Sequence, residues 1–142
     1  MMKQKGLTVG KLAKAATVNV ETLRYYERRG LLPEPPRTES GYRLYPKSAV
    51  ERLRFIKGAQ ALGFTLEEIQ ELLNLRMDEQ AHHADVRQRA EEKVVDIEHK
   101  IQALMAMKVA LQELIEQCHG DGPMGECPIL EALPSYFHHQ DN

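Results

Sequence analysis

The feature of the sequence that most limits the fold is the long stretch Ala84–Gln117, which contains neither glycine nor proline. Such a stretch predicts one continuous α-helix, and at the usual rise per residue this helix spans about 50 Å. The domain that the preceding residues could form is only about 25–30 Å across. The helix must therefore extend beyond its own domain.

This predicted helix carries an apolar seam. A lone helix cannot bury such a seam, so it needs a partner surface. A second copy of the same helix would cover it, and we expect a homodimer joined by a coiled coil. Packing against the chain's own N-terminal domain is the alternative. The seam has Lys108 at its one polar heptad position and consists of Val94, Ile97, Ile101, Leu104, Leu111 and Ile115.

The formal net charge of −2 hides an uneven distribution of charge. Residues 1–60 contain 13 Lys and Arg against 5 Asp and Glu, which is a net charge of +8. Residues 61–142 contain 6 against 16, which is a net charge of −10. A block this basic is typical of a segment that binds a polyanion such as nucleic acid. A solvated polar face is the alternative explanation.

Some classes of protein do not fit this sequence. It has no apolar run long enough to cross a membrane, and its opening MMKQKGLTV lacks the apolar stretch of a secretory leader, so we expect a cytoplasmic protein without membrane contact. Paired carboxylates, a nucleophile motif and a phosphate-binding loop do not appear, so we expect no enzyme. A cytosolic thiol enzyme or a metal-storage module using the two cysteines is the competing hypothesis.

The basic block begins with a helix-turn-helix pattern. Thr8 can cap a first helix whose apolar residues share one face, and a short break follows at residues 17–19. Asn19 can cap a second helix, VETLRYYERR, which Gly30 would end. Two short helices joined by a tight turn are typical of a helix-turn-helix unit.

A non-helical segment and two more helices complete the predicted N-terminal domain, residues 1–75. Prolines forbid a helix over residues 31–46, and the Ser40-Gly41 turn favours a short β-hairpin, or wing, between Arg37 and Tyr45. Ser48 can cap a helix over Ala49–Ala61. Thr65-Leu66-Glu67-Glu68 is a capping box that opens the next helix.

The second helix of a helix-turn-helix unit enters the major groove with its N-terminal side chains near the base edges. Val20, Glu21 and Arg24 are therefore the candidates for base contacts. Adjacent helical residues cannot both face the groove, and we expect Tyr26 rather than Tyr25 in the core. Phosphate contacts, which fix register without reading sequence, are expected from Tyr25, Arg28, Arg37 and Arg43.

The two cysteines, Cys118 and Cys127, flank a glycine-rich loop just after the long helix. The loop would let two thiolates turn toward one small cation, with His119 nearby. A metal site is our first interpretation and a thiol redox switch the second. A disulfide is the third, and the expected reducing compartment argues against it.

Two histidines, His82 and His83, stand at the start of the long helix. If two such helices pair antiparallel, His83 of one chain would approach the cysteines of the other, whereas parallel pairing would separate them by about 50 Å. Residues 76–83 would form a connector, 84–117 the dimerisation helix, 118–133 the metal-binding loop and a short helix, and 134–142 a frayed tail in which His138 and His139 carry no assigned role.

The chain resembles the mercury-resistance-regulator (MerR) family of transcription factors over nearly its whole length. The segment LTVGKLAKAATVNVETLRYYERRGLL is similar to that family's helix-turn-helix, and RTESGYRLYPKSAVERLRFIKGAQALGFTLEEIQELL to its wing and second helix pair. The cysteine loop followed by Pro128-Ile129-Leu130 resembles the metal-sensing branch. The implied fold is all-α with a small β wing: a winged helix-turn-helix domain, a long antiparallel coiled-coil dimerisation helix and a short C-terminal metal-binding loop.

The resemblance implies a homodimer that binds double-stranded promoter DNA, represses without metal, and activates with metal by bending and untwisting the DNA for RNA polymerase. It also implies DNA-contacting roles for Arg24, Tyr25, Arg37, Tyr42 and Arg43.

Divalent-metal sensors of this family usually carry a cysteine at the start of the dimerisation helix, and copper(I) sensors a serine. This chain has His83 there. Two thiolates and a neutral imidazole carry a charge of −2, which suits a divalent ion, and His119 could complete a tetrahedral zinc site. We therefore rank zinc first, then cadmium, lead or mercury, above copper(I). Copper(I) would lead if His83 faces solvent.

Overall fold

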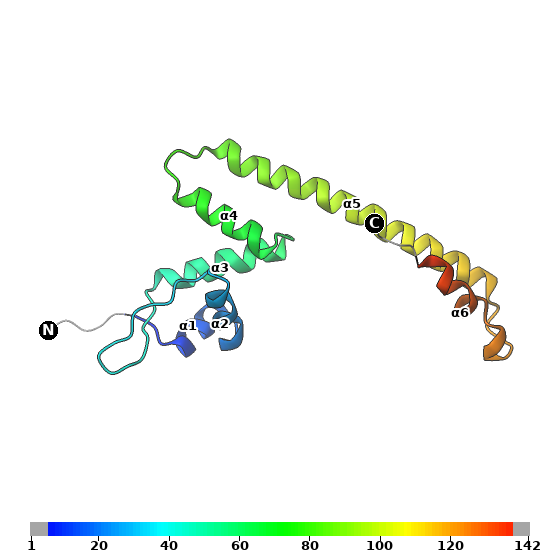
Figure 1. The fold of residues 1–142 in the computed structure, drawn as a ribbon, viewed down its shortest axis with the longest axis horizontal. Coiled ribbons are helices and arrows are strands. Elements are labelled where there is room, and N and C mark those ends of the chain that lie inside the picture. Colours follow the sequence, from blue (N-terminus) through cyan, green and yellow to red (C-terminus); the bar gives the residue numbers. More distant parts are fainter. Residues whose placement is uncertain (1–5, 138–142) are drawn as a thin grey trace. The chain divides into compact units, whose positions relative to one another are not determined.

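The computed structural model describes residues 6–137 of the chain, which divides into two units with the boundary after Lys93 (Figure 1). Helix α5 begins in the first unit and continues in the second. The elements are, in chain order, α1 (Val9–Ala16), α2 (Val20–Arg28), α3 (Ser48–Ala61), α4 (Leu66–Met77), α5 (His83–Gln117), the 3₁₀ turn η1 (Met124–Glu126), α6 (Pro128–Ala132) and the 3₁₀ turn η2 (Leu133–Tyr136).

The helix-turn-helix pattern of the sequence is confirmed by its caps. The Thr8 hydroxyl accepts a hydrogen bond from the Lys11 amide at 3.3 Å, and the Asn19 side chain accepts one from the Thr22 amide at 2.7 Å. Thr17 ends α1 in the left-handed conformation, with φ 59°. Gly30 follows α2 with φ 79°, a conformation that costs glycine little because it lacks a Cβ atom.

The core of the first unit lies where its four short helices meet. Helix α3 packs against both α1 and α4, and α1 packs against α2. Tyr26 is 3% exposed and Tyr25 is 40% exposed, which confirms the expected division between the two aromatics. The largest fully buried side chains are Leu12, Leu23, Leu31, Tyr45, Leu53, Ile56 and Ile69.

The expected β-hairpin is only partly present. Within residues 6–137 there is no strand, and the segment forms a single antiparallel pair, Arg37 with Arg43, closed by a turn at Gly41. Beyond this pair Tyr45 bonds instead to Leu7, whose amide and carbonyl both lie 2.8 Å from their Tyr45 partners. The prolines before Arg37 lack the N–H groups that a longer ladder would need. We refer to the loop of residues 33–46 as the wing.

The prediction that Ser48 caps α3 is wrong, because Ser48 is itself the first helical residue and Lys47 precedes the helix without a side-chain cap. The carbonyl of Pro46 accepts the Ala49 amide at 2.9 Å, so the backbone turn at Pro46 starts the helix. The capping box at Thr65 is confirmed, with the hydroxyl and the Glu68 carboxylate each accepting the other residue's amide hydrogen.

Two ion pairs join the start of α5 to α4 within the first unit. Lys93 is 6% exposed and its ammonium lies 2.8 Å from the Glu68 carboxylate, while Arg89 is paired with Glu71. The Lys93 ammonium also stands 5.5 Å from the centre of the Phe64 ring. Hydrogen bonding to Lys93 is the main reason that the pKa of Glu68 lies below its ordinary value.

The second unit, from Val94 onward, leaves the predicted seam uncovered. The six seam residues are between 38% and 62% exposed, whereas Leu114 in the last turns of α5 is buried. The chain turns back after α5 through the cysteine loop (Figure 1). Residues 134–136 of the expected frayed tail belong to η2, and residues 138–142 lie outside the described part. No helix in residues 6–137 is long and apolar enough to cross a membrane.

Candidate functional site

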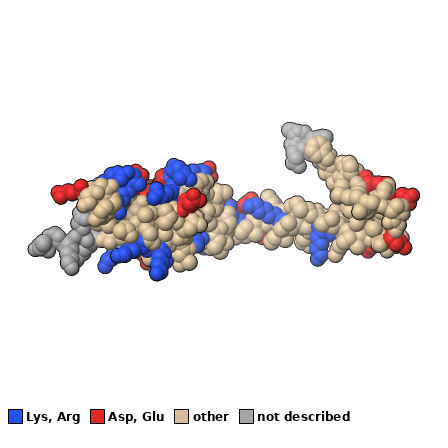
Figure 2. Space-filling view, turned by 90° about the horizontal axis from the view of Figure 1, so that it is seen from below, with Lys and Arg blue, Asp and Glu red and all other residues tan. Residues whose placement is uncertain are grey.

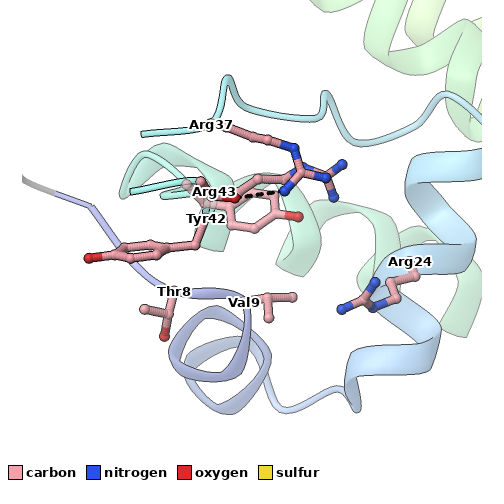
Figure 3. Close-up of a pocket in the computed structure, with 8 residues that line it drawn as sticks. Thr8, Val9, Arg24, Arg37, Tyr42 and Arg43 are labelled. Atoms are coloured by element: carbon pink, nitrogen blue, oxygen red, sulfur yellow. Dashed lines mark hydrogen bonds between the residues drawn. The ribbon is translucent and has the colours of Figure 1, made fainter. Parts of the chain in front are cut away.

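The first candidate site is a pocket of about 310 Å³ between the wing and the helix-turn-helix, lined by three arginines (Figure 3). Arg37 and Arg43 reach into it from the wing and Arg24 faces them from α2. Three cations around one opening make a strong attraction for an anion. The other lining residues are Thr8, Val9, Gly41, Tyr42 and Tyr45.

The wing fixes its two arginines by local bonds. The Arg37 guanidinium donates to the Gly41 carbonyl at 2.7 Å, across the turn. The Arg43 guanidinium lies 2.9 Å from the Glu34 carboxylate, in an ion pair whose arginine side chain is 26% and whose glutamate side chain is 56% exposed. Both arginines therefore hold defined positions at the rim before any ligand arrives.

The N-terminal half of α2 presents the predicted base-reading side chains. Glu21 and Arg24 are exposed and Val20 is half-buried against the core. Arg28 is exposed too, and with Arg24, Arg43 and two glutamates it lines a neighbouring pocket of about 340 Å³. The structure thus places Arg24 in both pockets and gives Glu21 no part in either lining.

Tyr25 contacts two neighbouring arginines and does not line the arginine pocket. Its hydroxyl accepts a hydrogen bond from Arg29 at 3.0 Å, and the Arg28 and Arg29 guanidinium carbons each lie 5.8 Å from the ring centre. Arg29 also forms an ion pair with Glu67 at 3.1 Å, which links α2 to α4. Tyr25 is therefore fixed on the exposed face of α2 and is not among the residues that line the arginine pocket.

Two contacts position the helix-turn-helix on the core. Lys57 on α3 donates to the Thr17 carbonyl at 3.0 Å and so ties the turn between the first two helices. The buried Tyr45 hydroxyl donates to the Glu27 carboxylate, which joins the wing to α2. Burial, followed by this hydrogen bond, raises the pKa of Tyr45 above its ordinary value, so the phenol stays neutral.

Blue Lys and Arg side chains crowd the surface of the first unit in Figure 2. Acidic side chains gather at the cysteine loop of the second unit, where Asp121 and Glu126 lie. The basic block of residues 1–60 therefore lies wholly within the first unit.

The second candidate site is the cysteine loop, which encloses a pocket of about 400 Å³. Cys118, His119 and Cys127 all line it, together with Met124 from η1. Both cysteines are free thiols of intermediate exposure. The Cys127 amide bonds to the Met124 carbonyl at 3.2 Å, which closes the turn η1 just before the second cysteine.

The predicted metal ligands meet only in part. Cys118, His119 and Cys127 share one pocket, but within residues 6–137 no three His, Cys, Asp or Glu side chains are grouped closely enough to hold a metal ion. His83 is exposed at the first residue of α5, and Cys118 follows the other end of that helix. His138 and His139 lie outside the described residues.

Several side chains at these sites were not expected from the sequence. The sequence predicts Thr8 only as a helix cap, yet the residue also lines the arginine pocket beside Val9. Glu34 stands between Pro33 and Pro35 in the non-helical segment, where its sequence context predicts no functional role, yet its carboxylate pairs with Arg43. No local pattern predicts the Glu34–Arg43 contact, because Arg37 rather than Glu34 is the residue opposite Arg43 in the antiparallel pairing.

Two family descriptions match the chain over most of its length. "MerR HTH family regulatory protein" matches residues 7–75, and "MerR, DNA binding" matches residues 50–114.

Known proteins are similar over almost the whole chain. The mercuric resistance operon regulatory protein of Serratia marcescens is 45% identical over 127 residues, which cover 89% of this chain and 87% of that protein. The HTH-type transcriptional regulator CueR of Escherichia coli is 39% identical over 134 residues, covering 94% and 98% of the two chains.

A solved structure agrees with the fold. The transcription regulator PbrR691 from Ralstonia metallidurans CH34, in complex with lead(II), superposes with a TM-score of 0.79 at 36% identity and covers 89% of this chain and 98% of that one. Identity and coverage of this extent do not arise from a shared domain alone. The chain therefore belongs to the MerR family of DNA-binding, helix-turn-helix transcriptional regulators.

Proposed function

We propose that this protein is a metal-responsive transcriptional regulator that binds a promoter as a homodimer, represses without metal and activates with metal. The observation that carries the proposal is the pairing of an arginine pocket on the helix-turn-helix with two free cysteines that line one loop pocket. The first can hold DNA phosphates, and the second offers two soft ligands.

At the DNA, α2 enters the major groove with Val20, Glu21 and Arg24 toward the bases. Phosphates on one side of the groove meet the wing arginines, with Tyr42 at the rim of the same pocket. Tyr25 and Arg28 on the outer face of α2 contact the adjoining backbone. The cation–π contacts of Tyr25 support this role, because they fix its hydroxyl on an exposed cationic surface.

The dimer forms through α5. Its seam is 38–62% exposed along several turns, and soluble chains rarely leave a continuous apolar stripe in water. A second α5 would cover the seam, and an antiparallel arrangement would bring His83 of one copy to the cysteine loop of the other.

The metal binds between Cys118 and Cys127, with the imidazole of His83 from the second copy as third ligand and His119 as a candidate fourth. This donor set has a charge of −2 and suits a soft divalent ion. Donor count alone favours zinc, followed by cadmium, lead and mercury. The relatives named for mercuric resistance and for a lead(II) complex support the heavier ions of this group.

Copper(I) is the alternative effector. Its preference for two thiolates would make His83 dispensable. The exposed position of His83 in the single chain is compatible with that alternative.

Activation proceeds by distortion of the promoter. Phosphate contacts at both ends of the dimer hold the duplex, and metal binding changes the relation between the two DNA-binding units. The energy for bending and untwisting the DNA comes from those contacts, and RNA polymerase then engages promoter elements that are otherwise misplaced.

A titration of the full-length dimer tests the proposal. Zinc, cadmium, lead, mercury(II) and copper(I) compete for the protein bound to a two-fold-symmetric duplex selected from random DNA, and DNA distortion is read by fluorescence of a base analogue at its centre. We expect at least one ion to change this signal, and Cys118→Ser or Cys127→Ser to abolish the change while DNA affinity stays within about twofold. The proposal fails if the serine variants respond like the unmodified protein.

His83→Ala and His82→Ala separate the two candidate effectors. We expect His83→Ala to lower the affinity for a divalent ion about tenfold or more, since losing even a group that supports a metal ligand costs about this much. His82→Ala should leave that affinity unchanged. Equal affinity in both variants would reject His83 as a ligand and favour copper(I).

The free cysteines also support a second candidate, a thiol redox regulator. It predicts the same change in DNA signal on treatment with peroxide in the presence of a chelator.

A further inference from the structure

Arg43, which lines the arginine pocket, forms an ion pair with Glu34. The two groups are 2.9 Å apart, and the arginine side chain is the more buried of the two. Both residues also line the neighbouring pocket that Arg24 and Arg28 share. A negative charge therefore stands among the cations that form the candidate DNA surface.

A carboxylate and a phosphate can bind a guanidinium in the same way, since both present two oxygens to its fork of N–H donors. Arg43 engages Glu34 in the free protein. We propose that Glu34 competes with the DNA backbone for Arg43, so that a phosphate must replace this carboxylate when the protein binds DNA. This inference rests on the proposed phosphate contact of Arg43.

Glu34 suits this role better than the other glutamate of that neighbouring pocket. Glu27 accepts a hydrogen bond from the buried Tyr45 hydroxyl, so its carboxylate is committed to the link between the wing and α2. Glu34 is 56% exposed and lies on the proline-rich arm of the wing, where its side chain can turn to water once Arg43 is taken.

The exchange has a consequence for salt dependence. A phosphate bound by a cation releases its condensed counterion, which adds about one to the slope of log affinity against log salt. When the phosphate replaces Glu34, the freed carboxylate attracts a cation from solution and offsets part of that release. Removing the carboxylate should therefore raise both the affinity and the magnitude of the salt slope.

The test compares Glu34→Gln with Glu39→Gln, which removes the same charge from an exposed residue of the same wing. The probe is a mixed-sequence duplex of about 30 base pairs, bound by full-length protein between 50 and 200 mM salt, a range over which phosphate contacts dominate. We expect Glu34→Gln to bind about two- to fivefold tighter, as an exposed ion pair would allow, with a slope steeper by up to about one. Glu39→Gln should change the affinity less than twofold and leave the slope unaltered.

A double variant identifies the route of the effect. In an Arg43→Gln background, Glu34→Gln should give no gain, because the competition needs the guanidinium. An equal gain in both backgrounds would mean simple repulsion of DNA by Glu34 and would overturn the inference. Equal effects of the Glu34 and Glu39 variants, or weaker binding by Glu34→Gln, would overturn it too.

Thermal unfolding of each variant verifies that the fold is kept, and Glu34→Asp, which retains the charge, should bind like the unmodified protein. Failure of the unmodified protein to bind the duplex would reject the proposed function itself. Binding by the unmodified protein together with any overturning result above would reject only the role of Glu34.

Discussion

The two units of this chain solve the burial of apolar residues in opposite ways. In the first unit, side chains such as Leu12 and Leu53 are fully buried among four short helices. In the second, the seam of α5 keeps Ile101 at 50% and Leu104 at 62% exposure. The first unit buries its apolar residues in its own core, whereas the apolar seam of the second can be buried only by another surface.

The difference extends to charge. The first unit carries its basic residues on a surface whose shape is fixed by its core, so the arginine pocket is formed before any ligand binds. The cysteine loop sits among acidic residues and depends on short turns such as η1. Recognition of a large polyanion requires a rigid platform, and a sensor gains from a loop that responds to its ligand.

A charge placed on the seam should have the largest effect, because it removes the surface through which the second unit pairs. We expect Ile101→Asp to dissociate the dimer and to lower the affinity for a two-fold DNA site by two to four orders of magnitude, the usual gain from joining two binding modules. Gln102→Asp adds the same charge beside the seam and should leave both unchanged. Sedimentation and DNA titration measure the outcome, and a dimeric Ile101→Asp would show that α5 is not the interface.

A cavity in the core gives the next largest effect. Leu53→Ala should lower the free energy of unfolding by about 2–5 kcal/mol, because a fully buried leucine loses its contacts and leaves a void. Leu62→Ala, at a residue 68% exposed just after the same helix, should cost less than about 0.5 kcal/mol. Denaturant unfolding measures the loss of unfolding free energy in each variant. Similar losses would contradict the buried core described for α3.

Arg43→Gln tests the surface of the first unit. It should weaken binding several-fold on every DNA sequence and reduce the salt slope by less than about one, since one phosphate contact is lost and Glu34 already offsets part of its counterion release. Arg54→Gln, outside both arginine pockets, is the matched control. If the loss depended on DNA sequence, Arg43 would read bases rather than hold the backbone.

The smallest expected effect concerns the junction of α4 and α5. Pairing with Lys93 keeps the pKa of Glu68 below its ordinary value, so the pair stabilises the fold above the unfolded glutamate pKa of about 4.3 and loses this contribution as the pH falls through the lower folded value. Lys93→Gln should therefore flatten the acid side of the stability curve. Lys100→Gln, on an exposed residue of the same helix, should not. Urea unfolding between pH 3 and 7 would show no difference between these two variants if the pair were irrelevant.

Local signals predicted much of the first unit. The caps at Thr8, Asn19 and Thr65 act within three residues of themselves, so the pattern of letters is enough to locate the helix starts. The division between Tyr25 and Tyr26 followed from helical periodicity alone. The prediction that Ser48 caps α3 was wrong because a turn closed by Pro46 can start a helix without a side-chain cap.

Local sequence patterns predict the structure of the wing only in part. Its prolines and the Ser40-Gly41 turn indicate a bend, but the number of paired residues depends on what lies alongside. Tyr45 pairs with Leu7, from a segment far away in the sequence, and this contact limits the ladder to a single pair. The Glu34–Arg43 contact is likewise a product of the bend and was not read from either residue's neighbours.

Local sequence patterns were enough to predict the long helix, its apolar seam, the two short helices with their turn, and the basic and acidic blocks. These depend on periodicity, capping and composition, which are properties of neighbouring residues. The folded structure was needed to show that Arg24, Arg37 and Arg43 share one pocket, that Glu34 pairs with Arg43, and that Lys57 holds the turn at Thr17. Those contacts join side chains from different elements, and their geometry is set by how the core packs rather than by any local pattern.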